Sequence, residues 1–198
     1  MPPVIAPGKI LVTGVNGFLG AHIARDLLKR GFSVVGTVRS PAKGDEISRY
    51  FSQYGEKFSY TTVKELDQPG AFDEIISTGK FDGVAHTAAP VPSGQSIVSV
   101  GSLMGARVHS PTVKRVVYTS GGLAASQPDP NTKYLLPKAH WNDSLVKLVE
   151  EKGDTATDFE RYGASKAVSE KAAWNYVADN KDEIDFDLVT VLPTAVCA

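Results

Sequence analysis

The most constraining feature of this sequence is a run of glycines between an apolar stretch and a helical stretch. Gly14, Gly17 and Gly20 follow the strand-like residues Lys9–Thr13, and they open the amphipathic stretch Gly17–Arg30. Glycine is needed where a backbone turns sharply and where it approaches a pyrophosphate closely. The free N–H groups and the dipole of the following helix would hold the phosphate charge. The pattern also fits a turn that binds nothing, but the strand before it and the helix after it favour a dinucleotide site.

Strand-like runs alternate with helical stretches along the rest of the chain. This order predicts an α/β fold, a Rossmann-type doubly wound parallel sheet of about six strands with helices on both faces. The expected strands are Lys9–Thr13, Phe32–Val38, Lys57–Val63, Phe81–His86, Lys114–Thr119 and Asp185–Leu192. The expected helices are Gly17–Arg30, Asp45–Tyr54, Pro69–Ser77, Ser96–Val108, Asn142–Lys152 and Asp158–Asn180. We expect loops at Ala88–Gly94 and Gly121–His140, and residues 1–198 to form one domain.

Composition narrows the class of partner. The net charge is −1, with Lys and Arg spread along the chain, which argues against a nucleic-acid surface. No apolar run approaches the length of a membrane span, and residues 1–8 do not resemble a signal peptide. The single cysteine, Cys197, makes a reducing compartment the default, so we expect a cytoplasmic protein. No metal site is predicted.

The end of the second expected strand indicates which dinucleotide is bound. An NAD site usually carries Asp or Glu there, about 20 residues past the glycines. This chain has Arg39, with Lys43 four residues on. A guanidinium can bind a 2′-phosphate in a bidentate, charge-assisted way, and a second cation would add to it. Both side chains could instead be solvated on a surface loop, but the position of Arg39 favours NADP(H) over NAD(H).

The glycine spacing and Asn16-Gly17-Phe18 resemble the extended branch of the short-chain dehydrogenases/reductases. Within that branch the chain is similar to the NADPH-dependent aldehyde and ketone reductases related to dihydroflavonol reductase. The similarity covers nearly the whole chain and is strongest at residues 37–40, 69–74, 84–88, 113–120 and 140–142.

The resemblance implies a role for several residues along a bound NADP(H). The pyrophosphate would lie over Gly14, Asn16, Gly17, Phe18, Leu19 and Gly20. Glu65 and Leu66 would border the adenine, and Thr87, Ala88 and Ala89 would run along the middle of the cofactor. Pro193 and Thr194 would lie near the nicotinamide, while His86 is expected to be a core residue.

Tyr162 and Lys166 open a long expected helix and lie four residues apart, so they share one helix face. Reduction of a carbonyl needs a proton on its oxygen. A free phenol, with a pKa near 10, is a poor partner at neutral pH, and a nearby ammonium favours the phenolate. In the resembled family the lysine also holds the nicotinamide ribose. The pair could also be incidental on an exposed face, but the preceding glycine turn favours catalysis.

The chain departs from the family at three places. Gly121 occupies the position of the family's catalytic serine, so Ser120 takes that role only if the glycine-rich loop shifts. The segment between Pro90 and Gly101 is several residues shorter than in the family. The sequence stops at Ala198, where family members continue into most of the substrate pocket. Together the three departures suggest a copy that is truncated at the C-terminus, a degenerate copy, or an incomplete gene model. Its last apolar strand would then be exposed, which favours self-association.

Three functions remain open at this stage. The first is reduction of a small aldehyde or ketone by NADPH, favoured by the intact Tyr162 and Lys166. The second is a non-catalytic NADPH-binding module, favoured by Gly121 and the missing C-terminal part. The third is a nucleotide-sugar epimerase or dehydratase, against which Arg39 argues.

Overall fold

The fold is seen in a computed structural model, which describes residues 4–66, 68–88, 112–126, 140–194 and 196. Its strands are β1 (Lys9–Thr13), β2 (Ser33–Val38), β3 (Phe58–Thr62), β4 (Gly83–His86), β5 (Arg115–Thr119) and β6 (Asp187–Val191). Its α-helices are α1 (Phe18–Lys29), α2 (Pro41–Tyr50), α3 (Asp73–Gly79), α5 (Asp143–Lys152) and α6 (Asp158–Asp179). Short 3₁₀ turns are η1 (Ser52–Lys57), η2 (Gly122–Ala124) and η3 (Gly153–Thr155).

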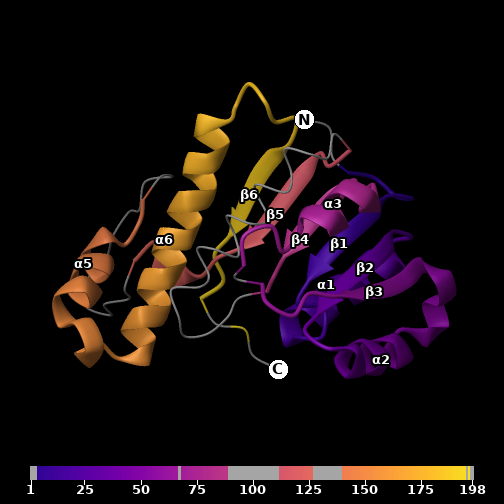
Figure 1. The fold of residues 1–198 in the computed structure, drawn as a ribbon, viewed down its shortest axis with the longest axis horizontal. Helices are drawn as coiled ribbons and strands as arrows, with labels where there is room; N and C mark the ends of the chain where they lie inside the picture. The colour runs from indigo at the N-terminus through magenta and orange to yellow at the C-terminus, as the bar shows by residue number, and fades with distance from the viewer. Residues whose placement is uncertain (1–3, 67, 89–111, 127–139, 195, 197–198) are drawn as a thin grey trace.

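The six strands form one parallel sheet in the order β3-β2-β1-β4-β5-β6. From β1 the chain adds β2 and β3 on one side of the sheet, and then β4, β5 and β6 on the other. The crevice at the carboxyl ends of the strands therefore opens between the glycine turn after β1 and the end of β4. Figure 1 shows these carboxyl ends at the lower end of the sheet, where α6 also begins. The predicted doubly wound Rossmann-type sheet is confirmed.

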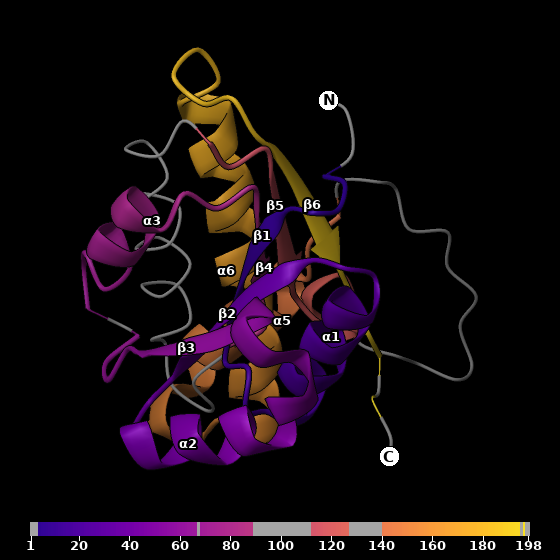
Figure 2. The ribbon, with the colours of Figure 1, turned by 90° about the vertical axis from the view of Figure 1, so that its right-hand side faces the viewer.

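Two apolar cores form, one on each face of the sheet. On one face, the buried side chains of Val12, Ala24 and Leu28 pack with those of α2. On the other face, Phe72 and Ile76 from the α3 side join Ala173 of α6. Figure 2 shows α1 and α3 on opposite sides of the sheet. Because both faces are covered, the strands carry nearly continuous β-branched and aliphatic runs instead of alternating polar residues.

Two helix starts differ from the sequence prediction. Helix α2 begins at Pro41, not at Asp45, because a proline in the first turn presets the helical backbone and needs no hydrogen-bond partner there. Helix α3 begins at Asp73, not at Pro69, because Gly70 has a φ of +77° and interrupts the helical backbone. The expected helix 96–108 and loop 88–94 lie outside the described residues, except for position 88.

Phe18 does not lie on the buried side of its helix, although an apolar residue in an amphipathic helix usually does. Its side chain is 48% exposed and lies against His22, with the ring centroids 4.6 Å apart. Phe18 is the first residue of α1, at the carboxyl end of β1. The position lies beyond the sheet surface that the rest of the helix covers.

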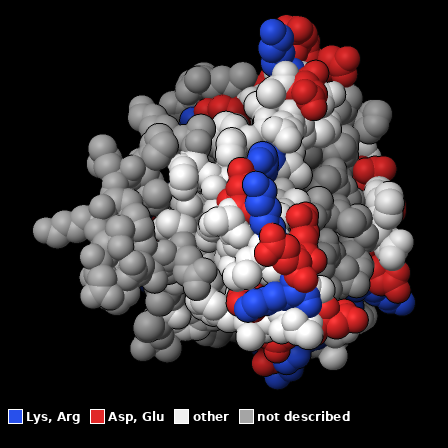
Figure 3. All heavy atoms as spheres, turned by 90° about the vertical axis from the view of Figure 1, so that its left-hand side faces the viewer, with Lys and Arg blue, Asp and Glu red and all other residues white. Residues whose placement is uncertain are grey.

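The described surface carries charges of both signs. Figure 3, which views the side that carries α5 and α6, shows acidic and basic side chains interspersed. Two of the ion pairs are Lys152–Glu160 at 2.6 Å and Lys171–Asp143 at 3.1 Å. Among the residues that the structure describes, no helix combines the length and the apolar character that a bilayer crossing needs.

Candidate active site

The glycine turn brings the start of α1 against the end of β1. Gly14 has a φ of +66°, a left-handed backbone that favours glycine, and its carbonyl oxygen accepts a hydrogen bond from the Gly17 N–H at 2.9 Å. A Cβ on Gly20 would lie 2.4 Å from the same carbonyl oxygen, so only glycine fits there. The Gly14 N–H donates to Thr37 Oγ1 at 3.1 Å, which ties the turn to β2.

The first turn of α1 is suited to an anion. Its N-cap is Gly17, and no side chain caps the N–H groups of this turn. The first turn also carries no acidic residue. Unsatisfied N–H groups and the positive end of the helix dipole therefore face the crevice. This is the arrangement that binds a phosphate in dinucleotide-binding folds.

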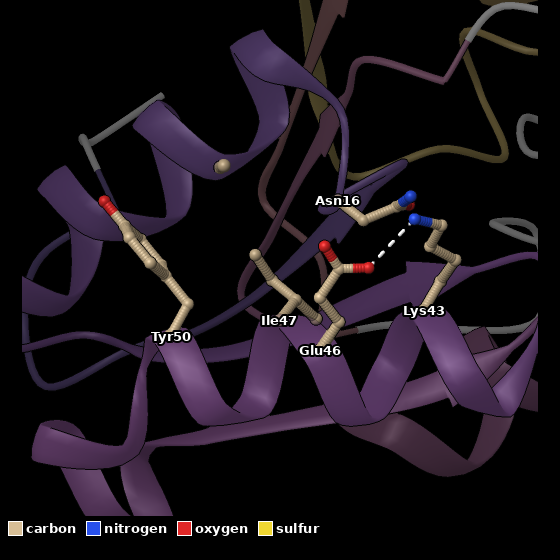
Figure 4. A pocket seen from close by; sticks show the side chains of 6 residues that line it. Asn16, Lys43, Glu46, Ile47 and Tyr50 are labelled. Atoms are coloured by element: carbon tan, nitrogen blue, oxygen red, sulfur yellow. Dashed lines mark hydrogen bonds and ion pairs between the residues drawn. The ribbon is translucent and has the colours of Figure 1, made fainter.

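A pocket of about 350 Å³ lies between the glycine turn and α2. Figure 4 shows Asn16 of the turn facing Lys43 and Glu46 of the helix. Lys43 Nζ donates to Glu46 Oε2 at 2.8 Å, and the Lys43 ammonium lowers the pKa of the Glu46 carboxyl. The lining also includes Ala21, Ile47 and Tyr50. The structure thus brings Asn16 and Lys43 together, while Arg39 is exposed just after β2 and does not line this pocket.

Thr13 links the glycine turn to the end of β4. Its hydroxyl oxygen accepts hydrogen bonds from the N–H groups of Thr87 and Ala88, both at 3.1 Å. The hydroxyl also lies 2.8 Å from His86 Nδ1. With both lone pairs in use, the hydroxyl proton must go to His86 Nδ1, so the ring proton of His86 sits on Nε2. Residues 87 and 88 are thereby held beside Gly14, whose Cβ would lie 3.1 Å from the Ala88 Cα.

His86 is a core residue, as predicted. Its side chain is buried, and its ring is stacked near Tyr118 with centroids 5.7 Å apart. Burial, followed by the positive charge of Lys166, lowers the pKa of His86 to about 3. A histidine that stays neutral near pH 7 and is enclosed by protein is no candidate for proton exchange with a substrate.

Helix α6 positions the tyrosine and the lysine. It begins with a capping box, in which the Thr157 hydroxyl accepts from the Glu160 N–H at 3.3 Å and Glu160 accepts from the Thr157 N–H at 2.8 Å. Tyr162 and Lys166 follow on successive turns. Lys166 is 4% exposed, and its Nζ lies 5.8 Å from the centre of the Tyr162 ring.

Lys166 is a buried cation with few partners. Its Nζ donates to the carbonyl oxygen of Thr119, the last residue of β5, at 3.3 Å. Burial lowers the pKa of Lys166 to about 8, although the charge of Glu170, one turn further along α6, opposes this shift. Lys166 therefore carries most of its charge at pH 7. Its ammonium can stabilise a neighbouring phenolate or donate hydrogen bonds to ribose hydroxyls.

The position of the family's serine faces Tyr162. Gly121 is extended, with φ −164° and ψ 153°, and a Cβ there would lie 3.5 Å from Tyr162 Oη and 3.7 Å from Lys166 Cγ. Successive side chains of an extended segment point to opposite sides. Ser120 therefore points away from Tyr162. Its Oγ is buried and has no hydrogen-bond partner in the described part of the chain, so the geometry favours position 121 over Ser120 beside the tyrosine.

The chain after β6 lies beside this position. The Gly122 N–H donates to the Pro193 carbonyl oxygen at 2.8 Å, and a Cβ on Gly122 would lie 3.1 Å from Thr194 Cγ2. Pro193 and Thr194 therefore lie beside Gly122, the residue after Gly121. The family resemblance implies that the nicotinamide binds at this end.

The remaining predicted residues are less closely grouped. Glu65 is exposed after β3, and Leu66 packs against the core on the α3 side. Neither lines the pocket beside Asn16. Ala89 lies outside the described residues. Among the residues that are described, no group of His, Cys, Asp or Glu could hold a metal ion.

Sequence reasoning missed Glu46 and Glu170. Glu46 shares the pocket with Lys43, and Glu170 is a buried carboxylate that acts on Lys166. A signal existed for both, since each lies three or four residues after its lysine on a helix. Charged pairs at this spacing are common on solvated faces, which is why the signal alone is weak.

Relatives of known name match most of this chain. The ketoreductase adrE of Penicillium rubens is 36% identical, over 96% of this chain and 57% of its own length. Aldehyde reductase 2 of Sporidiobolus salmonicolor is 35% identical, over 93% of this chain and 56% of its own length. This chain thus spans little more than half the length of these relatives.

A solved structure agrees with the fold and the sequence. Yeast methylglyoxal/isovaleraldehyde reductase Gre2, complexed with NADPH, superposes with a TM-score of 0.79 at 26% identity. The match covers 94% of this chain and 57% of that one. The model of the NAD dependent epimerase/dehydratase family matches residues 10–118, more than half of the sequence. The chain belongs to the NAD dependent epimerase/dehydratase family.

Proposed function

We propose that this chain is an NADP(H)-dependent oxidoreductase that reduces an aldehyde or ketone to an alcohol. The observation that carries the proposal is the buried Lys166 next to Tyr162, where the carboxyl end of β5 and the start of α6 meet. The relatives named ketoreductase and aldehyde reductase, and the NADPH complex of Gre2, support the same activity.

The residues present fit a dinucleotide. The first turn of α1 has no side-chain cap from the described residues, so its backbone N–H groups could bind the pyrophosphate. Gly14 and Gly20 allow the close packing that forms this turn. Arg39 and Lys43 would hold the 2′-phosphate. Glu65 and Leu66 would border the adenine, and the middle of the cofactor would run along Thr87, Ala88 and Ala89. Pro193 and Thr194 would line the nicotinamide end.

NADPH, when bound, would supply the hydride for the carbonyl carbon. Tyr162 Oη supplies the proton for the carbonyl oxygen, and Lys166 holds a positive charge beside the resulting phenolate. A buried ammonium stabilises a nearby anion more strongly than an exposed one, because little water screens it. Among the described residues, the Thr119 carbonyl is the one hydrogen-bond acceptor of Lys166 Nζ. The ammonium therefore has donors left for the ribose hydroxyls.

A second function, binding of NADPH without turnover, is favoured by Gly121. The family's serine would donate a hydrogen bond to the substrate carbonyl, and glycine has no such donor. Loss of one donor of this kind costs on the order of 10² to 10³ in rate. This estimate predicts slow turnover, but not its absence, as long as Tyr162 and Lys166 remain.

The test is NADPH oxidation by the purified chain with a panel of aldehydes and ketones. Tyr162→Phe serves as the matched variant, because it removes the hydroxyl and keeps the ring. We expect measurable oxidation by the parent chain, none above background by Tyr162→Phe, and equal NADPH affinity for both by calorimetry. If both bind NADPH and neither oxidises it with any carbonyl, the chain is a binding module.

The proposal extends to the compartment. A single cysteine, Cys197, fits a reducing environment, and NADPH-dependent reduction is compatible with it. We therefore place the protein in the cytoplasm. Fluorescence microscopy of a tagged full-length protein would contradict this if the signal followed an organelle marker.

A further inference from the structure

The pocket beside the glycine turn contains a charge that the cofactor would not favour. Glu46 lines the same pocket as Asn16 and Lys43, and its Oε2 accepts a hydrogen bond from Lys43 Nζ at 2.8 Å. Figure 4 shows the two charged ends together, next to the Asn16 amide. Lys43 is one of the two cations that would bind the 2′-phosphate, so the carboxylate and that phosphate have the same partner.

We propose that Glu46 competes with the cofactor's 2′-phosphate for Lys43, and so limits how strongly this chain prefers NADPH to NADH. The inference rests on the proposed cofactor and deepens it. Glu46 would then be a specificity-determining residue, because it weakens the attraction of Lys43 for the 2′-phosphate.

Geometry sets the size of the competition. An ammonium has three donors, so Lys43 could hold a carboxylate and a phosphate at once. Two oxygens that each lie about 2.8 Å from one nitrogen are at most about 6 Å apart. At that distance in water, two like unit charges change a binding constant by roughly threefold. A phosphate carries about 1.5 to 2 charges, so we expect an effect of about six- to tenfold in the absence of salt screening.

Solvent and salt should weaken the effect in a defined way. The side chains of Lys43 and Glu46 are 56% and 63% exposed. Charges at such positions are screened over about 8 Å at physiological ionic strength and over about 30 Å at 0.01 M. The competition should therefore approach tenfold at low salt and fall to about threefold at physiological salt.

The neighbouring acid on α2 provides the control. Asp45 does not line the pocket, and its Oδ1 accepts a hydrogen bond from Tyr60 Oη at 2.8 Å. Asp45→Asn removes the same charge one residue away and keeps an acceptor for Tyr60. Glu46→Gln removes the charge inside the pocket and keeps the side-chain length.

The experiment is calorimetric titration of the full chain and both variants with adenosine 2′,5′-bisphosphate and adenosine 5′-monophosphate, at low and physiological salt. We expect Glu46→Gln to bind the bisphosphate three- to tenfold more tightly than the parent chain does, and to bind the monophosphate with unchanged affinity. Asp45→Asn should change the ratio of the two affinities by less than twofold. Circular dichroism melting checks that both variants fold.

Three results would overturn the inference. An unchanged affinity ratio in Glu46→Gln would show that the carboxylate does not act on the phosphate. Weaker binding of the bisphosphate by Glu46→Gln would show that Glu46 orients Lys43. Weaker binding of the monophosphate would show that Glu46 binds the ribose. Failure of the parent chain to bind NADPH at all would instead refute the proposed function, so the two failures are distinguishable.

Discussion

Replacing Gly121 with serine should restore a hydrogen-bond donor beside Tyr162. The backbone at 121 is extended, which any residue adopts, and a Cβ would meet Tyr162 Oη at 3.5 Å and Lys166 Cγ at 3.7 Å. Both are ordinary contact distances, so the side chain fits without displacing its neighbours. A serine hydroxyl, one bond further on, would lie beside Tyr162 Oη. From there it could donate to a carbonyl oxygen that accepts the proton of Tyr162.

The expected magnitudes differ for stability and for rate. Replacing glycine at a position with a compatible backbone raises the free energy of unfolding by about 0.4 to 1 kcal/mol, mainly by restricting the unfolded chain. Alanine and serine should share this gain. A new donor to the carbonyl oxygen should raise kcat by on the order of 10² to 10³, and only serine provides it.

The assay compares NADPH oxidation and urea unfolding for the parent, Gly121→Ala and Gly121→Ser. We expect serine alone to speed turnover, and its gain to vanish when Tyr162→Phe is added. Two results would refute the reasoning. The serine variant could turn over no faster than the alanine variant, or both could be destabilised by more than about 1 kcal/mol, which would mean that position 121 has no free space.

Three other predictions follow from single features. Lys166 keeps its proton to higher pH when unfolded, because burial lowers its folded pKa to about 8 from 10.5. Between about pH 8 and pH 10.5 the free energy of unfolding should therefore rise by up to about 1.4 kcal/mol per pH unit. Lys166→Met should abolish that rise in denaturation curves, and parent turnover should fall over the same range. Arg39→Asp should reverse or abolish the preference for NADPH over NADH. The same ratio of NADPH to NADH affinity in the parent chain and in the variant, measured by calorimetry, would contradict this. Val189 and Val191 on the edge strand β6 are 38% and 47% exposed, so sedimentation should reveal self-association that Val→Thr changes reduce.

The sequence predicts the fold, and it predicts that Tyr162 and Lys166 lie together, for a physical reason. The glycine turn depends on local backbone geometry at Gly14 and Gly20, and the Tyr162–Lys166 pair depends on the helical repeat. Both are short-range properties, so the residues that specify them are close together in the chain. The two helix starts that were wrong also had local signals, in Pro41 and in the positive φ of Gly70.

The sequence does not reveal contacts that depend on how separate elements meet. Ser120 and Gly121 are adjacent, and only the pleat at the end of β5 decides which of them faces Tyr162. The tautomer of His86 depends on Thr13, which is 73 residues away. Only the packing of α2 beside the glycine turn shows that Glu46 lines the same pocket as Asn16 and Lys43.

The most direct test of the central claim follows the hydrogen from cofactor to product. The chain is incubated with a reducible ketone and NADPH that carries deuterium at one face of nicotinamide C4, and the alcohol is analysed by mass spectrometry. We expect an alcohol with one deuterium on the carbinol carbon from one labelled face and none from the other. We also expect Tyr162→Phe to form no alcohol although it binds NADPH. An unlabelled alcohol from both faces, or labelled alcohol from Tyr162→Phe at the parent rate, would contradict hydride transfer from NADPH with Tyr162 as the proton donor.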